Sequence, residues 1–115
     1  MEMEDRLGRY ADMFQALVPG LVRIYQDDSM QIILYGSAAR GTETEESDID
    51  IAVILTSYTR EMYDQMLDMV VDLELEYNKV LSVHLIPASK FSQWENVMPY
   101  YQNVKREGIV LWPAA

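Results

Sequence analysis

The chain has 115 residues, half of them hydrophobic, and contains no cysteine, which excludes disulfides and thiolate metal sites. Nineteen acidic and nine basic residues give a formal net charge of -10, which excludes unaided binding of DNA or RNA because that requires a basic face. A chain of this length is expected to form one domain, residues 1–115.

Nothing in the pattern predicts a membrane protein. The N-terminal stretch MEMEDRLGRY is charged and acidic, unlike a signal peptide. No apolar run approaches the roughly 20 residues that a transmembrane helix requires. We therefore expect a cytoplasmic protein, and its acidity favours a basic protein partner over nucleic acid or membrane.

The first apolar residues recur three or four positions apart, as on one face of a helix. They are Leu7, Tyr10, Ala11, Phe14, Leu17 and Val18. Pro19 and Gly20 are expected to interrupt this helix, and residues 21–26 to start a second helical turn. Asp27-Asp28-Ser29 is a turn signal.

Two short apolar runs follow, MQIILYG (residues 30–36) and DIDIAVIL (residues 48–55). Both are rich in β-branched residues and predict buried strands. The second run is too apolar to face water on either side beyond its first residues. The polar loop between them carries Glu43, Glu45 and Glu46, which we expect to be solvated.

From Arg60 the spacing predicts another helix, with Asn78 as its end. Its core face would consist of Met62, Met66, Met69, Val70, Leu73 and Tyr77. Because methionine-rich faces also serve protein interfaces, a second copy of the chain or another partner could use this face instead. Acidic residues occupy the other faces of this helix.

The remaining sequence predicts a strand in KVLSVHLI, closed by Pro87, and then one or two short helices. Pro99 suits a helix start and Gly108 a helix end. IVLW near the C-terminus would be a last strand or an apolar plug. The order of elements predicts an α/β (α+β) fold, a small mixed sheet flanked by helices.

Asp48 and Asp50 open the second strand. Residues two apart on a strand point the same way, so these carboxylates would lie side by side while Ile49 and Ile51 enter the core. Two close carboxylates repel each other, and a divalent cation relieves that repulsion. Mg²⁺ commonly takes one or two carboxylates together with substrate phosphates.

The turn before this strand could hold those phosphates. Gly36 allows backbone and ligand to approach closely, and the Ser37 hydroxyl could bind a phosphate oxygen. A helix beginning at Ala38 would present free N–H groups to an anion. Arg40 could pair with a phosphate or with one of the aspartates.

Each of these features alone is more often a plain turn, a strand start or a surface cation. Their combination, GSAARGTETEESDIDIAV (residues 36–53), resembles the signature of the DNA polymerase β-like nucleotidyltransferase superfamily. The short chain is similar to the minimal nucleotidyltransferase branch, and the closing NVKREGIVLW is loosely similar to an ending found in that branch.

The resemblance implies a palm-like fold in which Gly36 and Ser37 contact nucleotide phosphates. It implies Asp48 and Asp50 as catalytic Mg²⁺ ligands, and transfer of a nucleoside monophosphate from an NTP, in our interpretation AMP from ATP. It also implies a HEPN-domain protein as partner, toward which the minimal branch acts as an antitoxin.

One expected carboxylate is missing. Active superfamily members usually carry a third acid on a later strand, and KVLSVHLIP has none. Ser82 and His84 share one face of that strand. The position of His84 directly before LIP favours it as the replacement, as a base, a metal ligand or an inert substitute. Alternatively, Glu74, Glu76 or a second chain supplies the acid. A weak or inactive nucleotide-binding module that neutralises its partner by contact alone is therefore the second hypothesis.

The aromatic residues near the C-terminus have two readings. Tyr100 and Tyr101, with Trp94 and Trp112 nearby, could stack on a base. Packing of the last helix against the sheet explains them better, because aromatic side chains contribute much of the buried area in cores.

Overall fold

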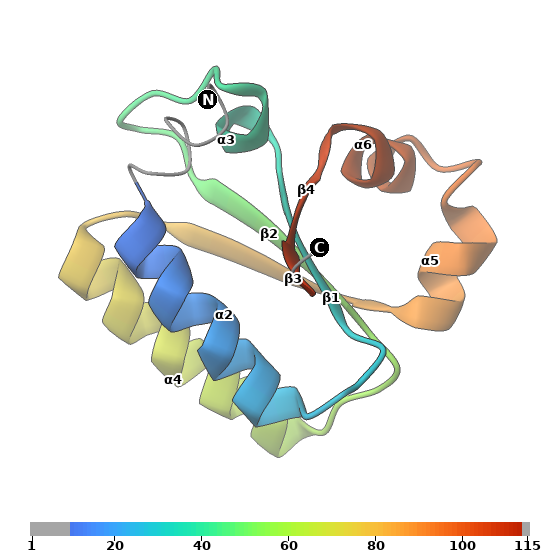
Figure 1. Ribbon diagram of the computed structural model, residues 1–115, viewed down its shortest axis with the longest axis horizontal. Coiled ribbons are helices and arrows are strands. Elements are labelled where there is room, and N and C mark those ends of the chain that lie inside the picture. The colour runs from blue at the N-terminus through green and yellow to red at the C-terminus, as the bar shows by residue number, and fades with distance from the viewer. Residues whose placement is uncertain (1–9, 114–115) are drawn as a thin grey trace.

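Four strands form one mixed sheet in the order β3-β2-β1-β4, with helices on both faces (Figure 1). The computed structural model describes residues 10–113. The strands are β1 (Gln31–Tyr35), β2 (Ile49–Leu55), β3 (Leu81–Pro87) and β4 (Ile109–Trp112). The helices are α2 (Ala11–Tyr25), α3 (Ser37–Arg40), α4 (Arg60–Tyr77), α5 (Ala88–Trp94) and α6 (Pro99–Glu107).

The strand pairing makes the sheet mixed. β1 is antiparallel to both β2 and β4, whereas β2 and β3 are parallel and joined through α4. Parallel neighbours require such a crossover connection. The predicted α/β class and the mixed sheet flanked by helices are therefore confirmed, and IVLW is a strand.

The larger core lies between the sheet and the pair α2 and α4 (Figure 1). On β2, Ile49, Ile51 and Val53 point into it and are fully buried, at 0% exposure. The intervening residues Ala52 and Ile54 face the opposite layer. Beyond Asp50 both faces of β2 are thus apolar, which explains the unbroken hydrophobic run from Ile51 to Leu55.

The expected break at Pro19-Gly20 is wrong, because α2 continues from Ala11 to Tyr25. Pro19 is exposed, so its ring meets solvent and not the core. Gly20 is buried, and a Cβ at this position would collide with the sulfur of Met69 on α4. Gly20 therefore allows close contact between two helices. Leu7, assigned to the same helix, lies outside the described residues.

Helix α4 follows the prediction closely. Thr59 caps its start by accepting a hydrogen bond from Met62 N at 3.1 Å, and Asn78 ends it in the left-handed conformation, with φ of 52°. Met66 is only 1% exposed, and Met62 and Met69 pack against the larger core. The methionine face is thus part of the core and is not a free interface.

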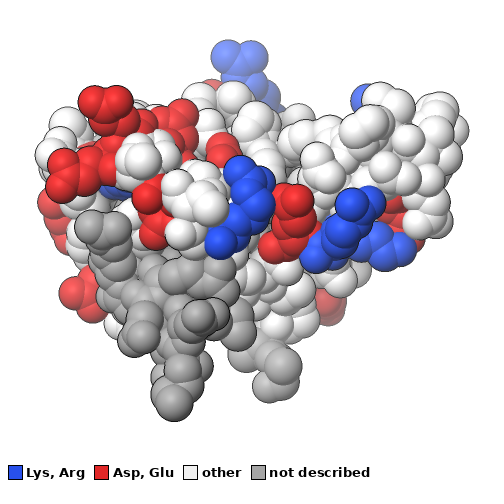
Figure 2. Space-filling model, turned by 90° about the horizontal axis from the view of Figure 1, so that it is seen from above, with Lys and Arg blue, Asp and Glu red and all other residues white. Residues whose placement is uncertain are grey.

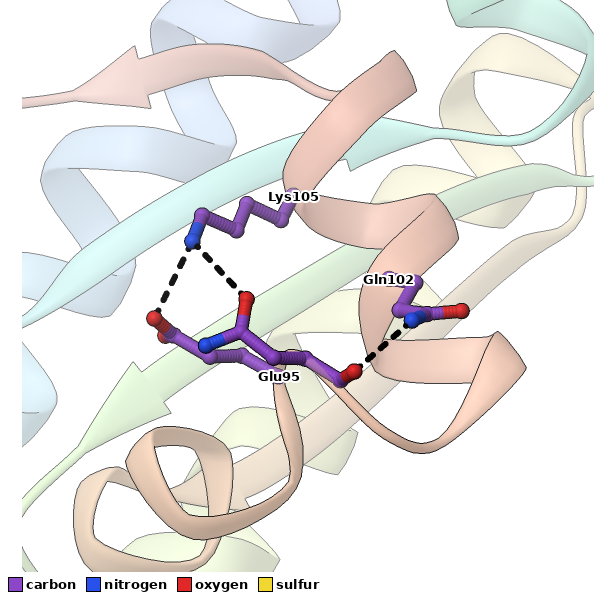
Figure 3. A network of polar contacts seen from close by, with 4 residues as sticks. Glu95, Gln102 and Lys105 are labelled. Atoms are coloured by element: carbon purple, nitrogen blue, oxygen red, sulfur yellow. Dashed lines mark hydrogen bonds and ion pairs between the residues drawn. The ribbon is translucent and has the colours of Figure 1, made fainter.

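The second face of the sheet is covered by α5 and α6, so the tail forms two helices. Phe91 of α5 and Val104 of α6 pack against Ile33, Ala52 and Ile54. Polar contacts then join the segment after α5 to α6 (Figure 3). They are an ion pair of Lys105 with Glu95 at 3.1 Å and a bond from Gln102 Nε2 to Asn96 O at 2.9 Å.

Acidic side chains are unevenly spread over the surface. Seen from above, they gather at the left of the molecule, whereas most of the basic side chains in view lie toward the right (Figure 2). Left and right are the same in Figure 1, where the loop between α3 and β2 lies on the left side. Glu45 and Glu46 of this loop are exposed, as predicted, whereas Glu43 is only partly exposed and its Oε2 atom is buried without a hydrogen-bond partner among the described residues. No helix in the described part of the chain is long and apolar enough to cross a membrane.

Candidate functional site

The turn after β1 is built around Gly36. Its backbone has φ of 76° and ψ of -156°, a combination that is essentially restricted to glycine. A Cβ at this position would collide with the Asp50 carboxylate. The single helical turn α3 starts directly after it, with Arg40 N bonded to Gly36 O at 3.1 Å. The predicted phosphate turn and one predicted aspartate are therefore in contact.

Asp50 projects from β2 on the same side as α5 and α6, opposite Tyr35 of β1 and Ser82 of β3. Burial, and then the nearby charge of Asp48, raises the pKa of the Asp50 carboxyl group. Smaller effects of His84 and Arg40 oppose this rise in pKa. No side chain within residues 10–113 donates a hydrogen bond to this carboxylate.

Asp48 lies one residue before β2 and is exposed. The negative charge of Asp48 contributes to the raised pKa of the Asp50 carboxyl group, so the two predicted acids lie close enough to repel each other. Asp48 also borders a cavity of about 420 Å³. Glu74 and Lys79 line the same cavity.

An aromatic group that the sequence did not predict lies beside Asp50. The hydroxyl groups of Tyr35 and Tyr100 are 3.0 Å apart, and the His84 ring lies 6.3 Å and 6.2 Å from their ring centroids. Burial is the main cause of the raised pKa of both tyrosines, and the charge of Asp50 contributes. Tyr101 instead packs edge-on against Phe91, as expected of a core residue.

Arg40 pairs with neither aspartate. Its guanidinium group forms an ion pair with Glu107 of α6 at 3.0 Å. The two side chains are 48% and 32% exposed, and exposed pairs of this kind contribute only about 0–1 kcal/mol. An arriving anion could therefore replace Glu107 as the partner of Arg40 at small cost.

The third carboxylate is absent from the position next to Asp50. Parallel pairing sets Ser82 directly beside Asp50, and His84 beside Ala52 one step further along. Both share the Asp50 face of the sheet, as the alternation predicted, but Ser82 rather than His84 is the direct neighbour.

The two glutamates considered as substitutes are separated from Asp50. Glu74 accepts a hydrogen bond from Leu81 N at 2.9 Å and so anchors the start of β3. Glu76 is exposed at the end of α4. Within residues 10–113, no group of three or more His, Asp or Glu side chains is arranged to hold a metal ion.

Hydrogen bonds hold the middle of the loop between α3 and β2 in place. Lys79 Nζ donates to Thr44 O and Glu45 O, both at 3.1 Å. Ser47 Oγ accepts from Thr44 N at 2.9 Å. These contacts set the approach of the chain to Asp48, and no pattern in the sequence indicates this role of Lys79.

The turn, the aspartate pair and the mixed sheet together match a known class of protein. Residues 17–107 match the family model described as the nucleotidyltransferase domain. Since this match spans most of the chain, the protein belongs to that family. The resemblance drawn from residues 36–53 is thereby confirmed.

Individual relatives agree with this assignment. A candidate protein adenylyltransferase of Methanocaldococcus jannaschii is 35% identical over 88 residues, which are 76% of this chain and 83% of that protein. A crystal structure of a toxin-antitoxin with AMP-PNP matches with a TM-score of 0.57 at 21% identity, covering 85% of this chain and 72% of the other.

A second crystal structure, of an MntA-HpeT toxin-antitoxin variant, has a TM-score of 0.54 at 19% identity. It covers 84% of this chain and 71% of the other, and its variant exchanges two aspartates for glutamates. At these identities the two structures establish the nucleotidyltransferase fold that the sequence predicted.

Proposed function

We propose that this protein transfers a nucleoside monophosphate, AMP from ATP, to a protein acceptor and acts as the antitoxin of a HEPN-domain partner. In this reaction an acceptor hydroxyl oxygen bonds to the α-phosphorus of the nucleotide. The bond between the α- and β-phosphates breaks, pyrophosphate leaves, and the hydroxyl proton is released.

One observation carries the proposal. The Asp50 carboxylate lies against the α-carbon of Gly36 so closely that no side chain fits between them. A phosphate held at the Gly36-Ser37 turn would therefore lie next to Asp50, the arrangement that phosphoryl transfer requires. Two aspartates at the same spacing are the ones exchanged in the MntA-HpeT variant.

The aspartate pair suits a divalent cation. Burial and Asp48 raise the pKa of Asp50, so the pair repels itself when both groups are ionised, and a cation removes this cost. Two carboxylates are enough for Mg²⁺, because it completes its shell with phosphate oxygens and water. Bound there, Mg²⁺ would neutralise charge on the triphosphate and on the leaving pyrophosphate.

The remaining residues have roles that follow from their positions. The Ser37 hydroxyl and the backbone N–H groups of Ser37 and Ala38, which begin α3, would bind phosphate oxygens. Arg40 would leave Glu107 and pair with the triphosphate. The reaction consumes ATP, so we propose the cytoplasm as its compartment.

The acceptor and partner assignments rest on the relatives. The similar protein from Methanocaldococcus jannaschii is named as acting on protein, and both similar structures are of toxin-antitoxins, one with AMP-PNP. The net charge of -10 agrees with a basic partner surface.

The test is incubation with α-labelled ATP, Mg²⁺ and a HEPN-domain protein encoded beside this chain. We expect label on the partner and release of pyrophosphate. Asp50→Asn should abolish both, whereas Asp28→Asn, an exposed aspartate at the other end of the sheet, should change neither. Label transfer that survives Asp50→Asn would disprove the assigned site.

The missing third carboxylate favours a second candidate function. With Ser82 beside Asp50, and no third acid grouped with Asp48 and Asp50 within residues 10–113, the protein would bind a nucleotide, transfer it slowly or not at all, and neutralise its partner by contact. Asp48→Asn combined with Asp50→Asn separates the two functions. If protection against the partner persists in this double variant, contact alone suffices. If protection is lost while the complex still forms, transfer is required.

A further inference from the structure

Helix α4 carries an apolar stripe on its outer side, formed by Leu67, Val71 and Leu75. These side chains are 41%, 49% and 78% exposed. Residues four apart are neighbours on a helix surface, so the three form one continuous row. The stripe lies apart from the core face of α4, where Met66, Val70 and Leu73 are buried.

An acidic row, Asp64, Asp68 and Asp72, runs beside the stripe at the same spacing and is exposed along its whole length. The sequence of α4 contains six acidic residues and one basic residue, Arg60. Arg60 already pairs with Asp64, at 3.2 Å. Asp68 and Asp72 form no ion pair within the described residues. The outer side of α4 is therefore both apolar and strongly negative.

We infer that this surface binds a basic amphipathic helix of a partner protein. Apolar side chains of that helix, three or four residues apart, would cover Leu67, Val71 and Leu75, as in other helix-binding surfaces. Lysine or arginine side chains beside them would pair with Asp68 and Asp72. The stripe extends from Leu67 to Leu75, nine residues with a rise of about 12 Å, a length that two to three turns of a partner helix match.

The negative charge of the acidic row argues against a second copy of the chain or a lipid surface as the binding partner of α4. If a second copy of the chain covered the stripe across a two-fold axis, the same surface would face itself and the acidic row would meet its own copy. Anionic lipid headgroups would be repelled in the same way. A bound basic amphipathic helix would both remove the apolar stripe from water and neutralise the acidic row.

The surface is separate from the candidate site. α4 packs on the side of the sheet that buries Ile49 and Ile51, whereas Asp50 faces α5 and α6. The inference therefore does not rest on the proposed function, and Leu75→Ser should leave calorimetric binding of ATP and Mg²⁺ unchanged.

The test uses a labelled helical peptide of leucine and lysine, with leucines three and four residues apart, and follows its fluorescence anisotropy on titration with the full chain. We expect saturable binding that weakens as salt rises, since salt screens charge pairs. Leu75→Ser should weaken binding about tenfold, and so should Asp68→Asn combined with Asp72→Asn. Hydrogen exchange should slow in α4 when the peptide is bound.

The controls match the variants in exposure. Val97→Ser changes an apolar residue, 62% exposed, in the segment between α5 and α6, and Glu45→Gln removes an exposed acid from the loop before β2. Both should bind the peptide like the parent protein. The inference is overturned if Val97→Ser weakens binding as much as Leu75→Ser, or if the same peptide with glutamate for lysine binds equally well. It is also overturned if sedimentation shows a dimer of the chain that Leu75→Ser dissociates.

Discussion

Replacing Gly36 by alanine tests the contact on which the candidate site depends. Alanine must adopt φ of 76° and ψ of -156° at this position, or the turn must change. Its Cβ would also meet the carboxylate of Asp50. The substitution therefore acts on the backbone and on the aspartate at the same time.

Both effects reduce stability. Holding a non-glycine residue in this region of φ and ψ costs about 1–3 kcal/mol. Displacing the Asp50 side chain adds to this cost, although a carboxylate at the end of a short side chain can rotate away. Alanine also restricts the unfolded chain, which returns about 0.4–1 kcal/mol. We expect the free energy of unfolding to fall by about 2 kcal/mol.

Urea denaturation followed by circular dichroism measures this change. Gly41→Ala is the matched control, because Gly41 also has a positive φ, of 77°, and ends α3 in the left-handed conformation. We expect Gly41→Ala to lower stability by about 1 kcal/mol through backbone conformation alone.

A double-mutant cycle separates the two effects at Gly36. In the background of Asp50→Ala the carboxylate is absent, so Gly36→Ala should cost less than in the parent protein. The difference between the two losses of stability is the energy of the contact between the alanine Cβ and the Asp50 carboxylate. If Gly36→Ala changes the stability by less than about 0.5 kcal/mol, or costs the same in both backgrounds, the contact between Gly36 and Asp50 is not as described.

Three further predictions concern stability. Asp27→Ala should destabilise by about 1 kcal/mol, because its partly exposed carboxylate accepts a 2.6 Å hydrogen bond from Thr56 N. That bond is the main cause that lowers the pKa of Asp27 below 3.8, so the stabilisation exists above this pH and is lost as pH falls through the folded pKa. Tyr25→Phe should leave stability unchanged or raise it by up to about 1 kcal/mol, because the buried hydroxyl has no hydrogen-bond partner within the described residues. Pro19→Ala should raise stability by roughly 1–3 kcal/mol by restoring a backbone hydrogen bond on an exposed side of α2.

Denaturation curves at several pH values and thermal unfolding test these three. A difference between the parent protein and Asp27→Ala that persists well below pH 3.8 would contradict the charge-based explanation. A loss of stability above about 1 kcal/mol in Tyr25→Phe would mean that its hydroxyl is bonded after all. A lower melting temperature for Pro19→Ala would show that proline contributes more by restricting the unfolded chain.

The sequence by itself determined most of the elements, apart from the continuation of α2 through Pro19, and the central motif. Three features each have a local physical cause: the apolar run of β2 after Asp50, the helical spacing of Met62, Met66 and Val70, and the helix end at Asn78. The segment from Gly36 to Val53 was enough to identify the family, because its residues resemble the signature of the nucleotidyltransferases and the family model matches the chain.

Only the tertiary structure decided which residues surround the motif. Gly20 signals a break in sequence, yet it serves close packing with Met69 because the fold brings α4 against α2. Tyr100 and Glu107 reach the site because α6 packs beside β1. Tyr100 follows its partner Tyr35 by 65 residues, and Glu107 follows its partner Arg40 by 67 residues. Local sequence encodes backbone preference and periodicity, whereas contacts between distant segments depend on strand order and helix packing, which no single segment specifies.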